Sequence, residues 1–118
     1  EVTGKDCTIF RFPGGSHNTL VRNAHGSSFT ENIILKLNEQ GINCYDWNVD
    51  SGDAKGNNIP AATIYNNVVK ESRDKNGELK SPAIVLMHDC MTKTTTVEAL
   101  PKIIQYFKEQ GYKFDTLN

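Results

Sequence analysis

The chain has 118 residues, a length typical of one domain, and 13 basic against 14 acidic residues give it a formal net charge of -1. A near-neutral chain without a basic run argues against nucleic acid as a partner, and its short apolar runs exclude a transmembrane helix. The three cysteines, Cys7, Cys44 and Cys90, form neither a Cys-x-x-Cys pair nor a zinc-finger spacing. Whether Cys7 and Cys44 pair stays open.

The first part of the chain predicts a strand, a helix and a second strand. Residues 8–12 are β-branched and aromatic, and a Pro-Gly-Gly loop ends them. Ser28 and Glu31 form a capping-box pattern for a helix that Gly41 ends. Residues 43–50 predict the second strand, which is followed by turn residues.

The second part of the chain predicts two helices with a strand between them. Pro60 suits the first turn of a helix, and residues 82–89 contain a continuous apolar run, as in a strand covered on both faces. A helix is predicted over 97–110, with Pro101 in its first turn, and residues 113–117 predict a short last strand. This alternation of strands and helices predicts an α/β fold with parallel strands and right-handed crossovers.

Three ionisable residues each lie at the carboxyl end of a predicted strand. They are Arg11, Asp50 and His88, and they follow one another at 39 and 38 residues, about one strand-helix unit each. Because functional groups in parallel α/β folds gather at this edge of the sheet, we expect the three side chains to converge. An Asp beside a His holds the imidazole in one tautomer, and a nearby Arg orients a carboxylate.

Each of these residues also has a simpler explanation. A single His at a strand end is more often structural, Asp50 is also a turn former, and Arg11 could pair with a surface carboxylate. Their predicted position at the same edge of the sheet favours a shared functional site over three separate structural roles. The Gly-rich loop over 13–16 is either a tight turn or an anion-binding nest, although it lacks the lysine of a P-loop.

His17 and His25 stand eight residues apart in a segment that we read as a polar loop. This is not a spacing that brings two ligands to one metal on a helix. Both side chains are therefore expected to be solvated.

Three segments together resemble a known family. Residues 11–16, Arg-Phe-Pro-Gly-Gly-Ser, resemble the Arg-x-Pro-x-Gly motif of the NodB-homology polysaccharide deacetylases, carbohydrate esterase family 4. Residues 47–53 resemble its Asp-x-x-Asp-Trp motif with the preceding strand, and residues 84–89 resemble its Leu-x-His motif. The order of the motifs fits the family, and the form Phe-Arg-Phe-Pro-Gly-Gly-Ser is especially similar to bacterial peptidoglycan N-acetylglucosamine deacetylases.

The resemblance implies hydrolysis of the acetamide of an N-acetylated glycan, either peptidoglycan or a chitooligosaccharide, with a divalent metal, taken to be zinc. It implies that His88 is the general acid, that Asp50 pairs with His88 and tunes it, and that Arg11 holds the catalytic base in place. It also implies that the backbone N–H of Gly14 donates to the oxyanion and that Leu86 lines the pocket for the acetyl methyl group.

Two departures from the family pattern matter. Ala54 stands where the family motif ends in Trp, so the aromatic wall of the groove is missing there. The family's Thr-Phe-Asp-Asp-Gly and His-x-x-x-His motifs, which supply the base and the metal ligands, do not occur in this sequence. The resemblance therefore identifies residues 1–118 as the C-terminal part of a NodB-homology domain. It implies half of a distorted (β/α) barrel, with three to four parallel strands, that is inactive in isolation.

Half of a parallel sheet leaves exposed edges, so we expect the chain to pair with the missing N-terminal half or to self-associate. The family also implies an extracellular or cell-surface location for the parent protein. Two alternatives stay open: a non-catalytic carbohydrate-binding remnant of the same fold, and an unrelated small anion-binding α/β module that uses the loop over 13–16.

Overall fold

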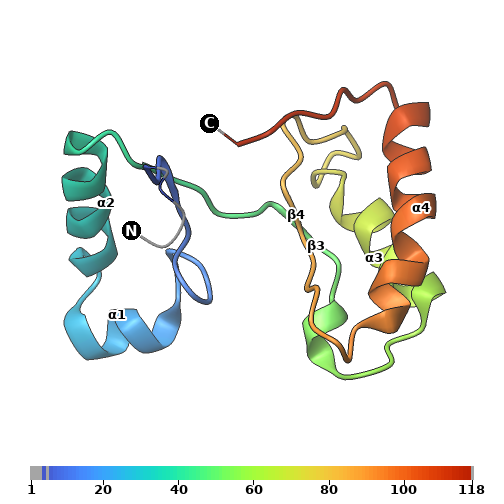
Figure 1. The fold of residues 1–118 in the computed structure, drawn as a ribbon, viewed down its shortest axis with the longest axis horizontal. Helices are drawn as coiled ribbons and strands as arrows, with labels where there is room; N and C mark the ends of the chain where they lie inside the picture. The colour runs from blue at the N-terminus through green and yellow to red at the C-terminus, as the bar shows by residue number, and fades with distance from the viewer. Residues whose placement is uncertain (1–3, 5, 118) are drawn as a thin grey trace. The chain divides into compact units, whose positions relative to one another are not determined.

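A computed structural model describes residue 4 and residues 6–117. The chain divides into two compact units (Figure 1). The first unit comprises Glu1–Asp46 and Asp115–Asn118, and the second comprises Trp47–Phe114. None of the described helices could span a lipid bilayer.

The first unit contains two short parallel strands and two helices. Strand β1 (Ile9–Phe10) pairs with β2 (Asn43–Cys44), and Ile9 lies opposite Asn43. Helices α1 (Thr19–His25) and α2 (Phe29–Glu39) contact each other, and α2 also contacts β2. This unit therefore has the parallel pairing and the intervening helix that the sequence predicts for its first half.

The second unit also contains two parallel strands and two α-helices. Strand β3 (Val49–Asp50) pairs in parallel with β4 (Val85–Leu86). A short 3₁₀ helix, η1 (Asp53–Lys55), follows β3, and α3 (Ala61–Glu71) precedes β4 in the chain. Helix α4 (Thr94–Glu109) packs against α3, which also contacts β3, so the helices and the strand pair form two layers (Figure 1).

The hydrophobic core of the second unit lies where α3 and α4 meet β3. Ile64 and Val68 are four residues apart and so lie on one face of α3, and Ile103 and Phe107 do the same on α4. All four side chains are at most 4% exposed. The complete cluster of buried residues is Val49, Ile64, Val68, Ala99, Ile103, Tyr106 and Phe107.

The predicted strand over 43–50 is wrong as a single element, because the chain changes partner in its middle. The main-chain N–H of Tyr45 still donates to Phe10 O at 2.9 Å, next to β1. Three residues later, Asn48 N donates to Ile84 O at 3.1 Å, and the Asn48 side chain accepts from Ile84 N at 2.8 Å. The first half of the segment therefore pairs with β1 and the second half with β4.

Four local expectations also differ from the structure. The polar loop around His25 contains α1, and Ser28 precedes α2 without a side-chain capping bond. Pro101 lies inside α4, because that helix begins at Thr94 and not at Val97. Residues 113–117, all of which are described, form no strand. The parallel α/β arrangement itself is confirmed.

Candidate functional site

The candidate site lies at the carboxyl ends of β3 and β4, where Asp50 stands opposite Leu86. After β3 the chain turns sharply at Gly52, whose φ is +71°, a conformation that favours glycine. A Cβ at Gly52 would also stand 2.6 Å from the Nδ2 atom of Asn67, which donates to Ser51 O at 3.0 Å. This turn brings Asp53, the first residue of η1, to the end of β4.

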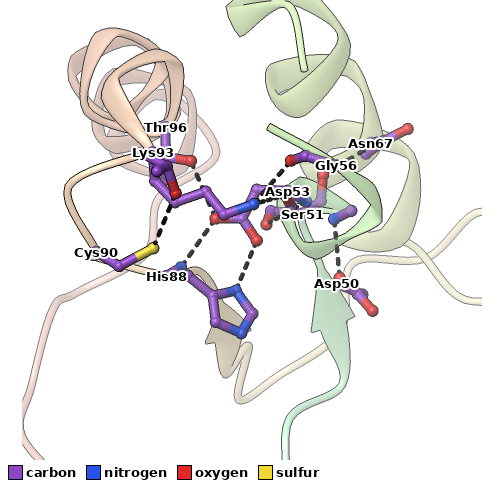
Figure 2. Close-up of polar contacts among 11 residues, drawn as sticks. Asp50, Ser51, Asp53, Gly56, Asn67, His88, Cys90, Lys93 and Thr96 are labelled. Carbon is purple, nitrogen blue, oxygen red and sulfur yellow. Dashed lines mark hydrogen bonds and ion pairs between the residues drawn. The ribbon is translucent and has the colours of Figure 1, made fainter. Parts of the chain in front are cut away.

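Asp53 and His88 form the central contact of the site (Figure 2). The Asp53 Oδ1 atom lies 2.8 Å from His88 Nδ1, and its Oδ2 atom accepts from the main-chain N–H of His88 at 2.8 Å. The Thr96 hydroxyl donates to the same Oδ2 atom at 3.0 Å. The side chain of Asp53 is 1% exposed and that of His88 is 41% exposed. A buried carboxylate thus holds an imidazole that solvent or a substrate can reach.

This geometry fixes the ionisation of the carboxylate and the tautomer of the ring. Burial alone would raise the pKa of Asp53, but the hydrogen bonds from the side chain and main chain of His88 and from Thr96 outweigh it, so the pKa lies below its ordinary value. Because an ionised carboxylate only accepts hydrogen bonds, Nδ1 of His88 must carry a hydrogen. The Nε2 atom is then the ring position that exchanges a proton with another molecule.

The predicted pairing of Asp50 with His88 is wrong, because Asp53 takes that position. Asp50 is exposed, and its Oδ1 atom accepts from the main-chain N–H of Gly52 at 2.8 Å, which stabilises the turn after β3. This is the turn-forming role that the sequence analysis left open for Asp50. Figure 2 shows the Asp50 side chain directed away from the His88 ring.

The loop with the predicted oxyanion donor lies in the first unit. Gly14 has a φ of +74°, and the main-chain N–H of Gly15 donates to Phe12 O at 2.9 Å, which closes a tight turn. The carboxylate of Asp46 accepts from Ser16 N, at 3.0 and 3.2 Å, and from the Ser16 hydroxyl. Asp46 therefore fastens this loop to the end of β2.

Arg11 and Leu86 keep their predicted places along the chain. Arg11 is exposed and directly follows β1 in the first unit. Leu86 is the last residue of β4 and is 8% exposed. Since Arg11 and His88 belong to different units, their convergence stays a prediction, as do the roles of Arg11, Gly14 and Leu86 with substrate.

The described residues contain no group of three or more His, Cys, Asp or Glu side chains that could hold a metal ion. The divalent metal that the resemblance implies therefore has no ligand set among them. Cys7, Cys44 and Cys90 are free thiols. Burial, followed by the nearby charge of Asp46, raises the pKa of Cys44, whereas the hydrogen bond with Thr92 lowers the pKa of the exposed Cys90.

Sequence reasoning missed Asp53, Thr96 and Lys93 as members of the site. The signal for Asp53 was present, since it is the second acid of the Asp-x-x-Asp pattern. Its choice over Asp50 depends on the turn at Gly52, which the pattern alone does not specify. Nothing in the sequence singles out Thr96 or Lys93, because both stand in the polar run over 92–96.

No family model matches the chain. Among curated proteins, the chain is 36% identical to a Bacillus subtilis protein named as a polysaccharide deacetylase, over 87% of this chain and 36% of that protein. It is 33% identical to a peptidoglycan-N-acetylglucosamine deacetylase of Bacillus cereus, over 86% of this chain and 36% of the relative. The chain thus spans less than half the length of these relatives.

Two solved structures are similar to this chain in both fold and sequence. The catalytic domain of the peptidoglycan N-acetylglucosamine deacetylase from Eubacterium rectale matches with a TM-score of 0.77 and 33% identity, over 98% of this chain and 49% of that one. A CE4 esterase from Streptococcus mutans matches with a TM-score of 0.73 and 32% identity, over 94% and 44% of the two chains. The resemblance drawn from the three motifs is therefore confirmed: the chain is a relative of the polysaccharide and peptidoglycan N-acetylglucosamine deacetylases of carbohydrate esterase family 4.

Proposed function

We propose that this chain supplies the general-acid side of a polysaccharide deacetylase site that acts on an N-acetylated glycan, either peptidoglycan or a chitooligosaccharide. The observation that carries the proposal is the bond of 2.8 Å between His88 Nδ1 and the buried carboxylate of Asp53. This bond fixes the His88 ring at Nδ1, and the ring is exposed enough for Nε2 to meet a substrate. The likeness to named deacetylases supports the class of reaction.

In this proposal His88 acts late in the hydrolysis of the acetamide. A water oxygen adds to the carbonyl carbon, and the bond between that carbon and the sugar nitrogen then breaks. An amine is a poor leaving group, so the nitrogen must take a proton as it departs. His88 Nε2 gives that proton, and Asp53 stabilises the charged ring before the transfer. The products are acetate and a free amino sugar.

The other predicted residues keep subsidiary roles in the proposal. Arg11 orients the base that deprotonates the water, the N–H of Gly14 donates to the oxyanion, and Leu86 borders the acetyl methyl group. Asp50 shapes the turn that places Asp53, and Asp53 is the carboxylate that bonds the ring. We propose that the base and a divalent metal, zinc by family resemblance, belong to residues outside this chain.

The proposal also includes the domain to which the chain belongs, its partner and the location of the parent protein. Residues 1–118 form the C-terminal part of a NodB-homology domain and half of its (β/α) barrel, so they pair with the N-terminal half or with a second copy. The parent protein acts outside the cell or at its surface. The 118-residue chain alone is expected to release no acetate.

The proposed function is tested by acetate release from an N-acetylchitooligosaccharide in the longest natural protein that carries this chain. His88→Ala should lower kcat by about 10²–10⁴-fold, the usual contribution of a positioned acid. The matched control is His25→Ala, at the end of α1, which should change kcat by less than about twofold. Full activity of the His88 variant would contradict the assignment. Glycan binding by the unaltered protein without acetate release would favour a non-catalytic role.

A further inference from the structure

Lys93 is a buried lysine whose side chain reaches across the candidate site. It stands directly before α4 and is 9% exposed. Its Nζ atom donates to Asp53 O at 2.6 Å and to Gly56 O at 2.7 Å (Figure 2). Both acceptors are main-chain carbonyls, one at the first residue of η1 and one directly after its last residue.

Burying an ammonium group costs free energy unless it is fully hydrogen-bonded, so a lysine in this position requires an explanation. The two carbonyl oxygens accept from two of its three N–H groups, and among the described residues no carboxylate forms an ion pair with it. The contacts link positions 40 and 37 residues apart in the chain. A long-range tie of this kind fixes η1 to the start of α4.

The bond of 2.8 Å from Gly52 N–H to Asp50 Oδ1 supports the turn before η1, whereas the bonds at η1 itself are longer. Within it, the main-chain N–H of Lys55 donates to Gly52 O at 3.2 Å, and Asp53 N donates to the Ser51 hydroxyl at 3.4 Å. Short 3₁₀ turns have poor hydrogen-bond geometry and give weak positional control. The two bonds from Lys93 are shorter than these local bonds and restrain the main chain at the start of η1 and directly after its end.

The start of α4 contacts Asp53 in two ways. Lys93 holds its main-chain carbonyl, and the Thr96 hydroxyl holds its carboxylate at 3.0 Å. The main-chain N–H of Thr96 also donates to Lys93 O at 3.1 Å, so the two residues belong to one local structure. The main chain and the side chain of Asp53 are thus both fixed from the same helix terminus.

We propose that Lys93 is a positioning residue for the His88 acid: by holding the carbonyls of Asp53 and Gly56, it keeps the Asp53 carboxylate in register with His88 Nδ1. This inference rests on the proposed function in one respect, since it assigns the held imidazole to catalysis. The geometric part concerns only the ring, the carboxylate and the lysine.

The test is the tautomer of neutral His88, read from long-range ¹H–¹⁵N spectra of the labelled 118-residue chain. In the unaltered chain the Nδ1-protonated tautomer should dominate, because Asp53 accepts from that nitrogen. In Lys93→Met, which keeps an unbranched side chain without the ammonium group and its donors, the ratio of the two tautomers should fall about tenfold. The matched control is Lys55→Met, which removes an exposed charge from the same turn and should leave the ratio unchanged.

A second variant, Lys93→Gln, retains neutral donors and replaces Lys93→Met if that variant loses its folded spectrum. Its tautomer ratio should fall below that of the unaltered chain, by less than about tenfold. An unaltered tautomer ratio in either folded variant would overturn the proposal. If neither variant keeps a dispersed amide spectrum, Lys93 serves the fold as a whole and the specific role is wrong. The measurement needs no substrate, so a lack of acetate release by the longest natural protein that carries this chain would contradict the proposed function and leave this result standing.

Discussion

The two units of this chain share the same kind of strand pair, but they are stabilised in different ways. The second unit has a closed apolar core of seven buried residues on β3, α3 and α4. In the described part of the first unit, the residues classed as buried are Gly15, Ser16 and Thr30, none of which is a large apolar residue. Leu20 and Leu35 of that unit are 77% and 61% exposed.

The difference shows how firmly each unit can hold a functional group. His88 and Asp53 stand on a unit whose helices bury Ile64, Val68 and Ile103 almost completely. The loop with Gly14 stands on a unit in which no large apolar residue is classed as buried among the described residues, and Asp46 bonds Ser16 in that loop. We therefore expect the acid side of the site to keep its geometry in this chain and the Gly14 loop to depend more on added contacts.

The largest expected difference concerns the core. Ile103→Ala in α4 removes a side chain that is 2% exposed, and it should lower the free energy of unfolding by about 2–5 kcal/mol. Leu35→Ala in α2 removes one that is 61% exposed and should change it by less than about 0.5 kcal/mol. Urea denaturation followed by circular dichroism measures both. Equal losses would show that the first unit buries Leu35 against something else.

The stability of the first unit should fall more on loss of a polar side chain than on loss of the exposed Leu35 side chain. Asp46→Ala removes the acceptor of the Ser16 main-chain and hydroxyl groups, and we expect a loss of about 1–3 kcal/mol because Ser16 N–H is left without its partner in a buried position. Hydrogen exchange at the Ser16 amide should accelerate accordingly. Asp6→Ala, at an exposed position, is the control and should leave that rate unchanged. Unchanged exchange in Asp46→Ala would show that the loop does not need this contact.

A smaller expected effect is a loss of stability of the second unit, and not of the first, as the pH falls. Because the pKa of Asp53 is lowered in the folded chain, its contribution to stability is complete above the ordinary carboxyl pKa of about 4 and is lost as the pH falls through the folded value. Asp53→Asn should remove this part of the acid dependence of the second unit. Amide spectra of Val68 and Ile103 between about pH 6 and pH 2 follow it. The same acid dependence in the unaltered chain and in Asp53→Asn would contradict the lowered pKa of Asp53.

The helices of the second unit could be predicted from the sequence because their apolar residues recur at helical spacing and Pro60 stands before the first of them. Helix α1 could not, since none of its described residues is buried and its pattern is weak. The change of partner between β2 and β3 depends on the side chain of Asn48, which bonds with the segment before β4. No local pattern contains that contact.

The site shows the same limit of local patterns. The sequence predicts His88 at the carboxyl end of a strand, and in the structure it lies two residues after Leu86, the last residue of β4, because position in an α/β fold follows from the order of elements. Its partner was assigned to Asp50 because strand ends suggested it, yet Gly52 in the left-handed conformation turns the chain so that Asp53 reaches the ring. Lys93 contributes through main-chain carbonyls, and such contacts leave no signature in residue types.

The most direct test of the account compares the two carboxylates in the longest natural protein that carries this chain, with acetate release from an N-acetylchitooligosaccharide as the readout. Asp53→Asn should lower kcat by about 100-fold, because the amide cannot stabilise the charged His88 ring, with little change in KM. Asp50→Asn should change kcat by less than about threefold, since it alters only the turn contact with Gly52. The opposite order would contradict the central claim that Asp53 orients the acid.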